Sequence, residues 1–301
     1  MNIKILGCHS ATPRGNFHTT SQLVELKNHL FLIDCGENTQ VRLREEKVKF
    51  SRIKNIFISH LHGDHFYGLI GLINTFNLLG RSIDLNIYGP IGIKDIIMLQ
   101  IKLSNSWTKY KLFFYELDNS QPELIYEDSL VKVNTIPLNH RVYTNGFLFE
   151  QKQGLRKINT ETVNKFNVPE YEYQNLKKGK DFINEQKIKI KNIDLTLDPD
   201  KPIRYAFCSD TSYYPKIANQ IKNIDLLYHE STFLNEHKDL ALKTLHSTAE
   251  QAAKIAALAK VGKLLLGHFS TRYKDKSSFL NEARLQFKNT YLAEEGETYK
   301  L

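Results

Sequence analysis

The stretch Phe57-Ile58-Ser59-His60-Leu61-His62-Gly63-Asp64-His65-Phe66-Tyr67-Gly68-Leu69 decides how this chain folds. The apolar run before it, 53–58, predicts a buried strand, and the pattern over about 64–79 predicts a helix. Three histidines and a carboxylate therefore sit where a strand ends and a helix begins. Because alternate residues of an extended segment share a face, His60, His62 and Asp64 can point the same way, while the helix start turns His65 aside.

This arrangement suits two adjacent metal ions better than one. Imidazoles favour zinc, and the carboxylate adds a hard oxygen ligand. The other interpretation is a polar loop with surface histidines. We disfavour it because residues elsewhere in the chain supply the missing ligands.

The composition is that of a globular protein. The chain has 301 residues, of which 41% are hydrophobic, enough for one large domain or two small ones. The N-terminus has no signal-peptide pattern, and no apolar run approaches the ~20 residues needed to span a bilayer. Cys8, Cys35 and Cys208 are widely spaced and lie in or beside strand patterns. We therefore expect buried, reduced thiols and a soluble protein of the cytoplasm.

The charge balance is basic, with 41 Lys and Arg against 33 Asp and Glu, a net charge of +8. Such a balance favours a polyanionic partner such as a nucleic acid. A composition rich in Lys, Asn and Ile is also what an AT-rich genome produces, so charge alone does not decide.

Periodicity predicts strands that alternate with helices in two β-rich halves. The expected strands are 1–7, 21–34, 53–58, 83–88, parts of 111–137, 146–150, 203–208, 224–229 and 263–266, and the expected helices are 37–46, 64–79, 91–103, 247–260 and 277–288. The last but one opens with an apparent capping box, Ser247-Thr248-Ala249-Glu250. Two sheets covered by helices, an αββα sandwich, accommodate this order.

An insertion interrupts the pattern over about 151–195. It is rich in Lys, Asn and Gln, and its apolar residues are sparse. The part from 151 to 191 carries ten Lys and Arg against five Asp and Glu. We expect an arm that projects from the core, with a short helix starting near Asn159.

Four residues at strand ends can join the histidine cluster. His140 and His268 each follow an apolar strand, and Asp210 at the end of another can bridge two metals with its two oxygens. Asp34 leaves a strand beside the site and is expected to support a ligand histidine. Taken singly, His140 is more often a surface or satisfied histidine, and Asp210 could equally cap the segment 212–220.

Taken together, these residues resemble the metallo-β-lactamase superfamily. The signature is His60-x-His62-x-Asp64-His65, completed in order by His140, Asp210 and His268. The resemblance covers essentially the whole chain and implies an αββα fold with two zinc ions at the edge of the sandwich.

Three local sequences are similar to the ribonuclease Z family, whose members process tRNA 3′ ends. The first is Asp34-Cys35-Gly36-Glu37-Asn38-Thr39-Gln40, which is similar to the family's DCGEGTQ, with asparagine in place of the second glycine. The second is His229-Glu230-Ser231-Thr232-Phe233 together with His246-Ser247-Thr248, which are similar to HEATF and HST. The third is Gly267-His268-Phe269-Ser270-Thr271-Arg272-Tyr273, which is similar to HFSSRY.

The resemblance implies roles for these residues. One zinc would be held by His60, His62, His140 and Asp210, and the other by Asp64, His65, Asp210 and His268. Asp64 would also accept a proton from the attacking water. His246, beside Glu230, would orient or protonate the leaving 3′-oxygen, although it could instead be a histidine that merely precedes a helix cap. Ser270 and Arg272 would contact phosphate, or form a structural ion pair.

The resemblance also implies partners. The insertion occupies the place of a flexible arm that grips tRNA, although a solvated insertion without a partner is the alternative. A homodimer and precursor tRNA as substrate are expected, with a 3′-hydroxyl left on the tRNA and a 5′-phosphate on the trailer. The polar loop 11–21 matches the family only loosely, which leaves discrimination against CCA ends open.

Two rival functions remain at this point. The first is another phosphodiesterase on the same scaffold, acting on cyclic nucleotides or aryl phosphodiesters. The second is a scaffold that binds RNA without cleaving it. Intact candidate ligands at all seven positions argue against the second rival.

Overall fold

The computed structural model describes residues 1–15 and 17–301, and Asn16 of the loop 11–21 lies outside the described residues. The chain forms two compact units. The larger unit comprises residues 1–127, 131–150 and 203–301. The smaller, which we call the insertion unit, comprises residues 128–130 and 151–202.

The larger unit is built on two seven-stranded sheets. In order across the first sheet lie β18 (Thr298–Lys300), β1 (Asn2–Gly7), β2 (Ser21–Leu26), β3 (His29–Ile33), β4 (Ile53–Phe57), β5 (Leu85–Pro90) and β6 (Leu112–Leu117). In order across the second lie β17 (Thr290–Leu292), β16 (Lys263–Gly267), β15 (Leu226–Glu230), β14 (Arg204–Cys208), β9 (Asn145–Gln151), β8 (Val131–Pro137) and β7 (Leu124–Glu127).

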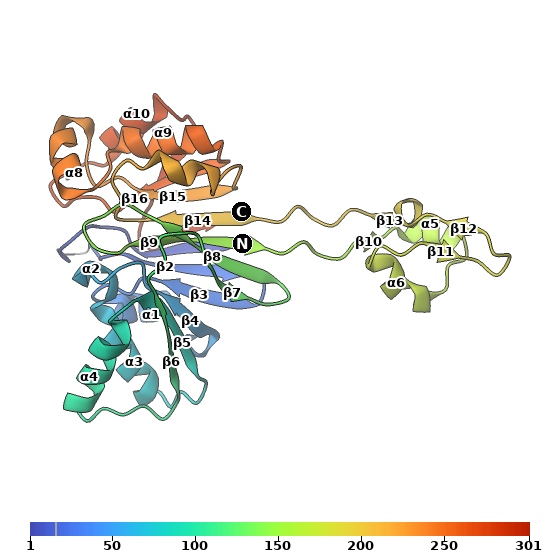
Figure 1. Ribbon diagram of the computed structural model, residues 1–301, viewed down its shortest axis with the longest axis horizontal. Helices are drawn as coiled ribbons and strands as arrows, with labels where there is room; N and C mark the ends of the chain where they lie inside the picture. The colour runs from blue at the N-terminus through green and yellow to red at the C-terminus, as the bar shows by residue number, and fades with distance from the viewer. Residues whose placement is uncertain (16) are drawn as a thin grey trace. The chain divides into compact units, whose positions relative to one another are not determined.

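Helices cover the outer faces of the two sheets, as Figure 1 shows. The first sheet carries α1 (Thr39–Glu45), α2 (Gly63–Phe66), α3 (Gly68–Leu78) and α4 (Ile93–Leu103). The second carries α8 (Lys238–Thr244), α9 (Ala249–Ala259) and α10 (Ser277–Arg284). Short 3₁₀ turns, η1 (Phe50–Arg52), η3 (Pro215–Asn219) and η4 (Asn235–His237), connect these elements. The predicted αββα sandwich is confirmed.

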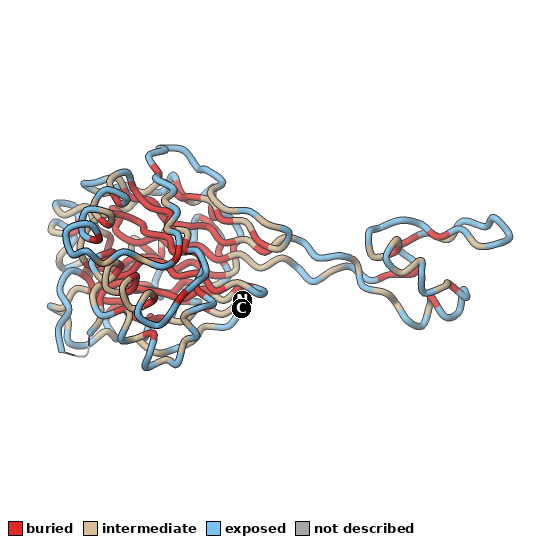
Figure 2. Tube along the Cα trace, turned by 90° about the horizontal axis from the view of Figure 1, so that it is seen from below, coloured by how far each residue is buried: buried red, intermediate tan, exposed pale blue. Residues whose placement is uncertain are grey.

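Aromatic rings fill the space between the two sheets. Phe31 of β3 and Phe57 of β4 face Phe147 and Phe149 of β9, with ring centroids 5.4 Å apart for Phe57–Phe147 and for Phe31–Phe149. All four side chains are fully buried, and buried segments dominate the strands of this unit in Figure 2. Central strands covered on both faces must be apolar throughout, which explains the continuous apolar runs in the sequence.

The predicted helix 64–79 is divided into α2 and α3 at Tyr67. The division lets Gly68 lie directly against the loop that follows β3: its N–H donates to the Cys35 carbonyl at 2.9 Å. A Cβ on Gly68 would lie 2.0 Å from the Gly36 oxygen. This backbone contact places the histidine-rich segment against the Asp34 loop.

The capping box of α9 lies one residue later than the sequence suggested. The N-cap is Thr248, whose hydroxyl accepts from Gln251 N–H while the Gln251 side chain accepts from Thr248 N–H. Ser247 is unavailable as a cap because its hydroxyl donates to the Thr211 carbonyl at 2.7 Å and its N–H donates to Glu230.

The insertion unit has a small core of its own, contrary to the impression of scattered apolar residues. Its elements are β10 (Lys157–Ile158), α5 (Thr160–Lys165), η2 (Glu170–Glu172), α6 (Tyr173–Lys177), β11 (Phe182–Ile183), β12 (Lys189–Ile190), α7 (Asn192–Leu195) and β13 (Thr196–Leu197). Val163, Leu176 and Leu195 are buried together. As predicted, a helix starts at Asn159, whose side chain accepts from Thr162 N–H.

Two further expectations concern the chain as a whole. Cys8, Cys35 and Cys208 are buried and free, as expected. Across residues 1–15 and 17–301, no helix is long and apolar enough to cross a membrane.

Replacement of two glycines of α3 by alanine should have different effects on the free energy of unfolding. Gly68→Ala should destabilise the fold by roughly 1–3 kcal/mol, because its methyl group would overlap backbone atoms that cannot yield. Gly71→Ala should be neutral or stabilise by up to about 1 kcal/mol, since alanine is the better helix former and its nearest neighbour is the movable end of Gln40. Chemical denaturation of both variants measures the difference. Equal unfolding free energies would contradict this account.

Candidate metal centre

The site lies at one edge of the sandwich, where strands of both sheets end. His60, His62, Asp64 and His65 follow β4 of the first sheet. The second sheet contributes one residue after each of three strands: His140 after β8, Asp210 after β14 and His268 after β16. The structure thus brings all seven predicted ligands together, in groups whose donor atoms lie within 4.8 Å of one another.

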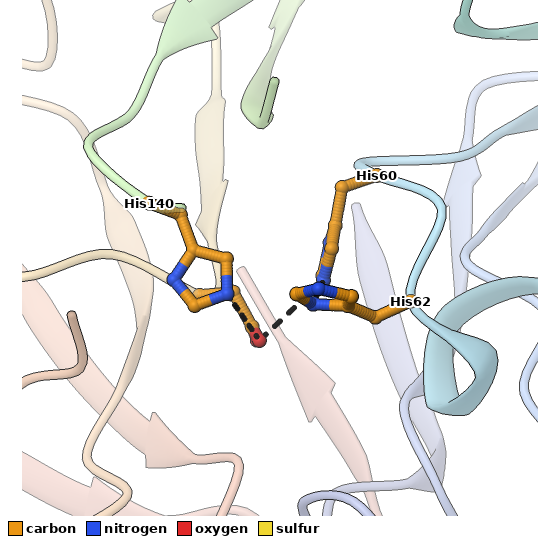
Figure 3. A group of neighbouring side chains, drawn as sticks. His60, His62 and His140 are labelled. Atoms are coloured by element: carbon orange, nitrogen blue, oxygen red, sulfur yellow. Dashed lines mark hydrogen bonds and ion pairs between the residues drawn. The ribbon is translucent and has the colours of Figure 1, made fainter. Parts of the chain in front are cut away.

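Asp210 stands between two groups of histidines. Its Oδ2 lies 3.5 Å from His60 Nε2 and 3.7 Å from His140 Nε2. His62 completes this group, with its Nδ1 2.9 Å from His60 Nε2. Figure 3 shows His140 approaching from the side opposite to His60 and His62, with ring nitrogens of all three directed at one place.

The other oxygen of Asp210 faces the second group. Oδ1 lies 3.2 Å from His65 Nε2 and 3.0 Å from His268 Nε2. Asp64 joins these residues, because its Oδ2 lies 3.5 Å from His65 Nε2 and 3.4 Å from His268 Nε2. The two oxygens of one carboxylate are therefore divided between two sets of nitrogen atoms, which is the arrangement expected of a bridging ligand.

A carboxylate and a hydroxyl group orient two of the imidazole rings that follow β4. Asp34 Oδ2 accepts from His65 Nδ1 at 2.6 Å, as the sequence predicted. Ser59 donates its hydroxyl to Asp34 Oδ2, so the same hydroxyl oxygen is free to accept from His60 Nδ1 at 3.0 Å. With Nδ1 carrying the proton, Nε2 of a neutral ring presents a lone pair to the cluster. Burial lowers the pKa of His65, but the carboxylates of Asp210, Asp64 and Asp34 outweigh it and raise this pKa well above its usual value. A metal ion bound at His65 Nε2 would take the place of that proton.

The histidines of the second sheet are held in the same way. The Leu245 carbonyl accepts from His140 Nδ1 at 3.0 Å. Thr232 donates its hydroxyl to Glu230 at 2.6 Å and accepts from His268 Nδ1 at 2.9 Å. These orienting groups were not predicted. Ser59 and Thr232 lie inside the sequence motifs of the site, whereas a backbone carbonyl such as that of Leu245 cannot be recognised from the sequence.

Three residues of the site have an unusual backbone. Asp34, Asp210 and His268 each come directly after a strand or one residue later, and each has a positive φ, of 54°, 59° and 57° respectively. Residues other than glycine pay about 1 kcal/mol or more in this left-handed region.

The arrangement fits metal ions on the chemistry of its donors. His140 Nε2 is buried and has no hydrogen-bond partner among the described residues, although it faces Asp210. Burial lowers the pKa of His60 well below its usual value, and burial also lowers the pKa of His62 and of His140. These rings are therefore neutral and able to coordinate a cation. Imidazole and carboxylate donors in this number suit zinc or a similar divalent ion.

Glu230 and His246 form a pair beside the cluster. Glu230 is the last residue of β15 and is fully buried, and its Oε1 lies 2.9 Å from His246 Nδ1. Backbone N–H groups of Thr211 and Ser247 donate to the same carboxylate, at 2.7 and 3.0 Å. Burial opposes charging of His246, but Glu230 outweighs it and raises the pKa of His246 to about 9. The imidazole is thus protonated at neutral pH.

The cluster opens into a pocket of about 480 Å³. Its wall includes Arg141, which lies outside the sequence motifs, and Ala11, Tyr67 and Phe233, to which the motifs assigned no role of their own. Tyr67 is 61% exposed, unusual for a large aromatic side chain. Its ring packs over Gly63, where a Cβ would lie 2.3 Å from it.

Arg272 lies beside an aromatic ring at the edge of the site. Its guanidinium lies 5.7 Å from the centre of the Phe233 ring, and no ion pair joins it to an acidic residue of the described chain. Ser270 lines the pocket and its hydroxyl accepts from Arg272 N–H at 3.4 Å. Among the described residues Arg272 therefore forms no ion pair, and its contact with phosphate stays a prediction.

Comparisons with known proteins agree with this geometry. The chain is 49% identical to ribonuclease Z of Bacteroides thetaiotaomicron, over 97% of this chain and 93% of that protein. It is 45% identical to ribonuclease Z of Bacteroides fragilis, over 97% and 96% of the two chains. Residues 1–152 also match the model of the family described as anti-Pycsar protein Apyc1.

Among solved structures, human tRNase Z, short form, superposes with a TM-score of 0.72 at 24% sequence identity, covering 100% of this chain and 99% of that one. This likeness supports the fold. The relatives named ribonuclease Z align over nearly the whole chain, beyond the end of the Apyc1 match, and so across Asp210, Glu230, His246 and His268. The protein belongs to the ribonuclease Z family.

Proposed function

We propose that the protein is a metal-dependent endoribonuclease that removes the 3′ trailer from precursor tRNA. It would leave a 3′-hydroxyl on the tRNA and a 5′-phosphate on the trailer. The observation that carries the proposal is the joint presence of a shared Asp210 carboxylate and a charged Glu230–His246 pair in one pocket, in a chain 49% identical to a ribonuclease Z.

We infer two zinc ions in this site. The first would be held by His60, His62, His140 and Asp210, and the second by Asp64, His65, His268 and Asp210. When bound, such ions supply Lewis-acid activation of a water molecule and stabilisation of charge on the phosphoryl oxygens.

Asp64 is the residue we assign as proton acceptor. Its Oδ2 is directed at His65 and His268 and accepts from Ala11 N–H at 2.8 Å. Its Oδ1 has no hydrogen-bond partner among the residues that the structure describes, and Asp64 lines the pocket. Although burial raises the pKa of Asp64, the nearby His65 and His268 hold it below its usual range. The carboxylate is therefore ionised and has one oxygen free for a proton from water.

His246 is the residue we assign as proton donor to the leaving 3′-oxygen. Its Nδ1 is engaged by Glu230, whereas its ring lines the pocket. A protonated imidazole held by a buried carboxylate can give up its Nε2 proton as the phosphodiester bond breaks. Glu230 then stabilises the charge and orientation of the ring.

The insertion unit is the part we assign to tRNA binding. Ion pairs occupy Arg156, Lys157 and Lys189. Lys178, Lys180 and Lys187 are exposed, and none of them pairs with an acidic group of the described chain. Unpaired lysines suit contacts with phosphates that do not depend on base sequence.

We also infer a homodimer located in the cytoplasm. The dimer is supported by the family resemblance alone. The location is supported by three free, buried cysteines, which fit a reducing compartment.

The first test uses a 3′-extended precursor tRNA and bis(p-nitrophenyl) phosphate, each with and without chelator. We expect chelator-sensitive cleavage of the tRNA near its discriminator base. Hydrolysis of the small ester alone would instead indicate a phosphodiesterase with another substrate, and RNA binding without cleavage would indicate a non-catalytic scaffold.

Asp64→Ala should abolish tRNA cleavage, with a loss of at least about 10²–10⁴ in kcat because the proton acceptor is removed. The Kd for tRNA should change little, since phosphate contacts elsewhere supply most of the affinity. Single-turnover kinetics and filter binding measure the two quantities. Asp95→Ala removes an exposed carboxylate of α4 and is the matched control. Cleavage that persists in Asp64→Ala would make the assigned mechanism wrong.

His246→Ala should separate the two substrates. Cleavage of tRNA should fall by about 10²–10⁴, because the leaving 3′-oxygen needs a proton. Hydrolysis of bis(p-nitrophenyl) phosphate should fall much less, since p-nitrophenolate leaves without protonation. His237→Ala, a histidine that contacts Tyr273, serves as control. Equal losses on both substrates would contradict the role of proton donor.

Replacing Lys178, Lys180 and Lys187 together by alanine should weaken tRNA binding. The slope of log K against log salt should fall by about one for each lysine that contacts phosphate. Hydrolysis of bis(p-nitrophenyl) phosphate reports separately on the metal centre. Unchanged tRNA affinity and salt slope in this variant would exclude these lysines from the tRNA interface.

A further inference from the structure

The loop between β1 and β2 reaches the metal centre through a backbone group. Ala11 N–H donates to Asp64 Oδ2 at 2.8 Å, although the two residues are 53 positions apart. Ala11 has a φ of 60°, in the left-handed region, and its side chain is exposed. A left-handed φ is unfavourable for alanine, and an exposed side chain makes no buried contacts that would compensate. Something else must hold the loop in the position that directs this amide at Asp64.

The segment before Ala11 is joined to the strand end that carries His268. Ser10 N–H donates to the Phe269 carbonyl at 3.0 Å, and Phe269 N–H donates to the Cys8 carbonyl at 3.1 Å. These bonds fix one side of the loop next to the second histidine group. The returning side is joined to the loop itself by backbone bonds between Arg14 and Phe17, and to the outgoing side by the packing of Phe17 against His9, with ring centroids 4.3 Å apart.

Glu295 joins the two sides of the loop. Its Oε1 accepts from His18 N–H at 2.8 Å and lies 2.9 Å from His9 Nδ1. Its Oε2 lies 2.6 Å from His18 Nδ1. His9 N–H also donates to the His18 carbonyl at 3.1 Å. One carboxylate thus holds the residues at which the loop leaves and returns, His9 and His18.

The contacts favour a charged carboxylate. The Glu295 side chain is only 13% exposed. Burial raises the pKa of Glu295, but the hydrogen bonds from His9 and His18 outweigh it and lower the pKa below its usual value. Glu295 is otherwise remote from the chemistry, in the segment between β17 and β18, and neither the family motifs nor the mechanism above uses it.

We propose that Glu295 is a positioning residue for the metal centre: by holding His9 and His18 together it keeps the Ala11 amide against Asp64 Oδ2. With Oδ2 fixed in this way, the carboxylate presents Oδ1 to the pocket. The proposal rests on the proposed function for the two bound ions and for the role of Asp64 as metal ligand and proton acceptor.

Cys8 lies near this group, and a metal site made of Cys8, His9 and Glu295 is the competing interpretation. Their donor atoms lie within 4.8 Å of one another. However, the Cys8 thiol donates to the Ala293 carbonyl at 3.4 Å, and both oxygens of Glu295 already accept hydrogen bonds. Burial also raises the pKa of Cys8, which disfavours the thiolate that a metal requires. The hydrogen-bonded arrangement is therefore the better account.

The test compares Glu295→Ala, Glu295→Gln and the control Glu294→Ala, which removes the neighbouring, exposed carboxylate. Two measurements need no RNA: hydrogen exchange of the Ala11 amide by NMR, and zinc affinity by competition with a chelator. In Glu295→Ala we expect faster exchange of the Ala11 amide and weaker binding of one of the two ions, by about 10–100-fold. The other ion should bind as in the unmodified protein.

Glu295→Gln should retain most of both properties, because its amide can satisfy the same partners after a change of His18 tautomer. If Glu295→Ala fails to fold, as judged by near-UV circular dichroism, His18→Phe removes the side-chain contact to Oε2 alone and should shift both measurements in the same direction. Unchanged exchange and zinc affinity would overturn the proposal, as would weakened zinc binding with the Ala11 amide still protected. Neither readout depends on tRNA cleavage, so a failure of the proposed function is distinguishable.

Discussion

The buried carboxylate of Asp210 is the constraint on which the site depends. A carboxylate that is 3% exposed is costly to bury unless positive or hydrogen-bonding groups surround it. Here the surrounding groups are imidazoles from both sheets, which share its two oxygens. The strands must therefore end at one edge, and the two sheets must face each other closely enough for these side chains to meet. The aromatic layer of Phe31, Phe57, Phe147 and Phe149 maintains that spacing.

Much of the site was predictable from the sequence, because its residues lie at ends of elements that the sequence marks clearly. The junction of apolar strand and helix located His60 to His65, and apolar runs located His140, Asp210 and His268. The groups that orient the rings were less predictable. Ser59 and Thr232 act through hydrogen bonds formed only when distant strands pack, and Leu245 acts through a carbonyl that every residue possesses.

The errors in the predicted elements have the same origin. The helix 64–79 is divided because Gly68 contacts the Asp34 loop, a tertiary contact that local periodicity does not contain. The capping box of α9 is displaced because Ser247 donates hydrogen bonds to Glu230 and Thr211 and is not available to cap the helix. The core of the insertion unit escaped notice because Val163, Leu176 and Leu195 are far apart in a polar sequence. In each case a long-range contact overrides a local preference.

The seven candidate ligands are drawn from both sheets, four from the segment after β4 and three from the ends of strands in the second sheet. Ions held by such a set would link the two halves of the sandwich in addition to supplying the chemistry proposed above. Any ligand that binds only the folded state adds to the free energy of unfolding, by about 2.7 kcal/mol when its free concentration is a hundred times its Kd. Loss of the ions would then remove this contribution to the free energy of unfolding together with the chemistry that the ions supply.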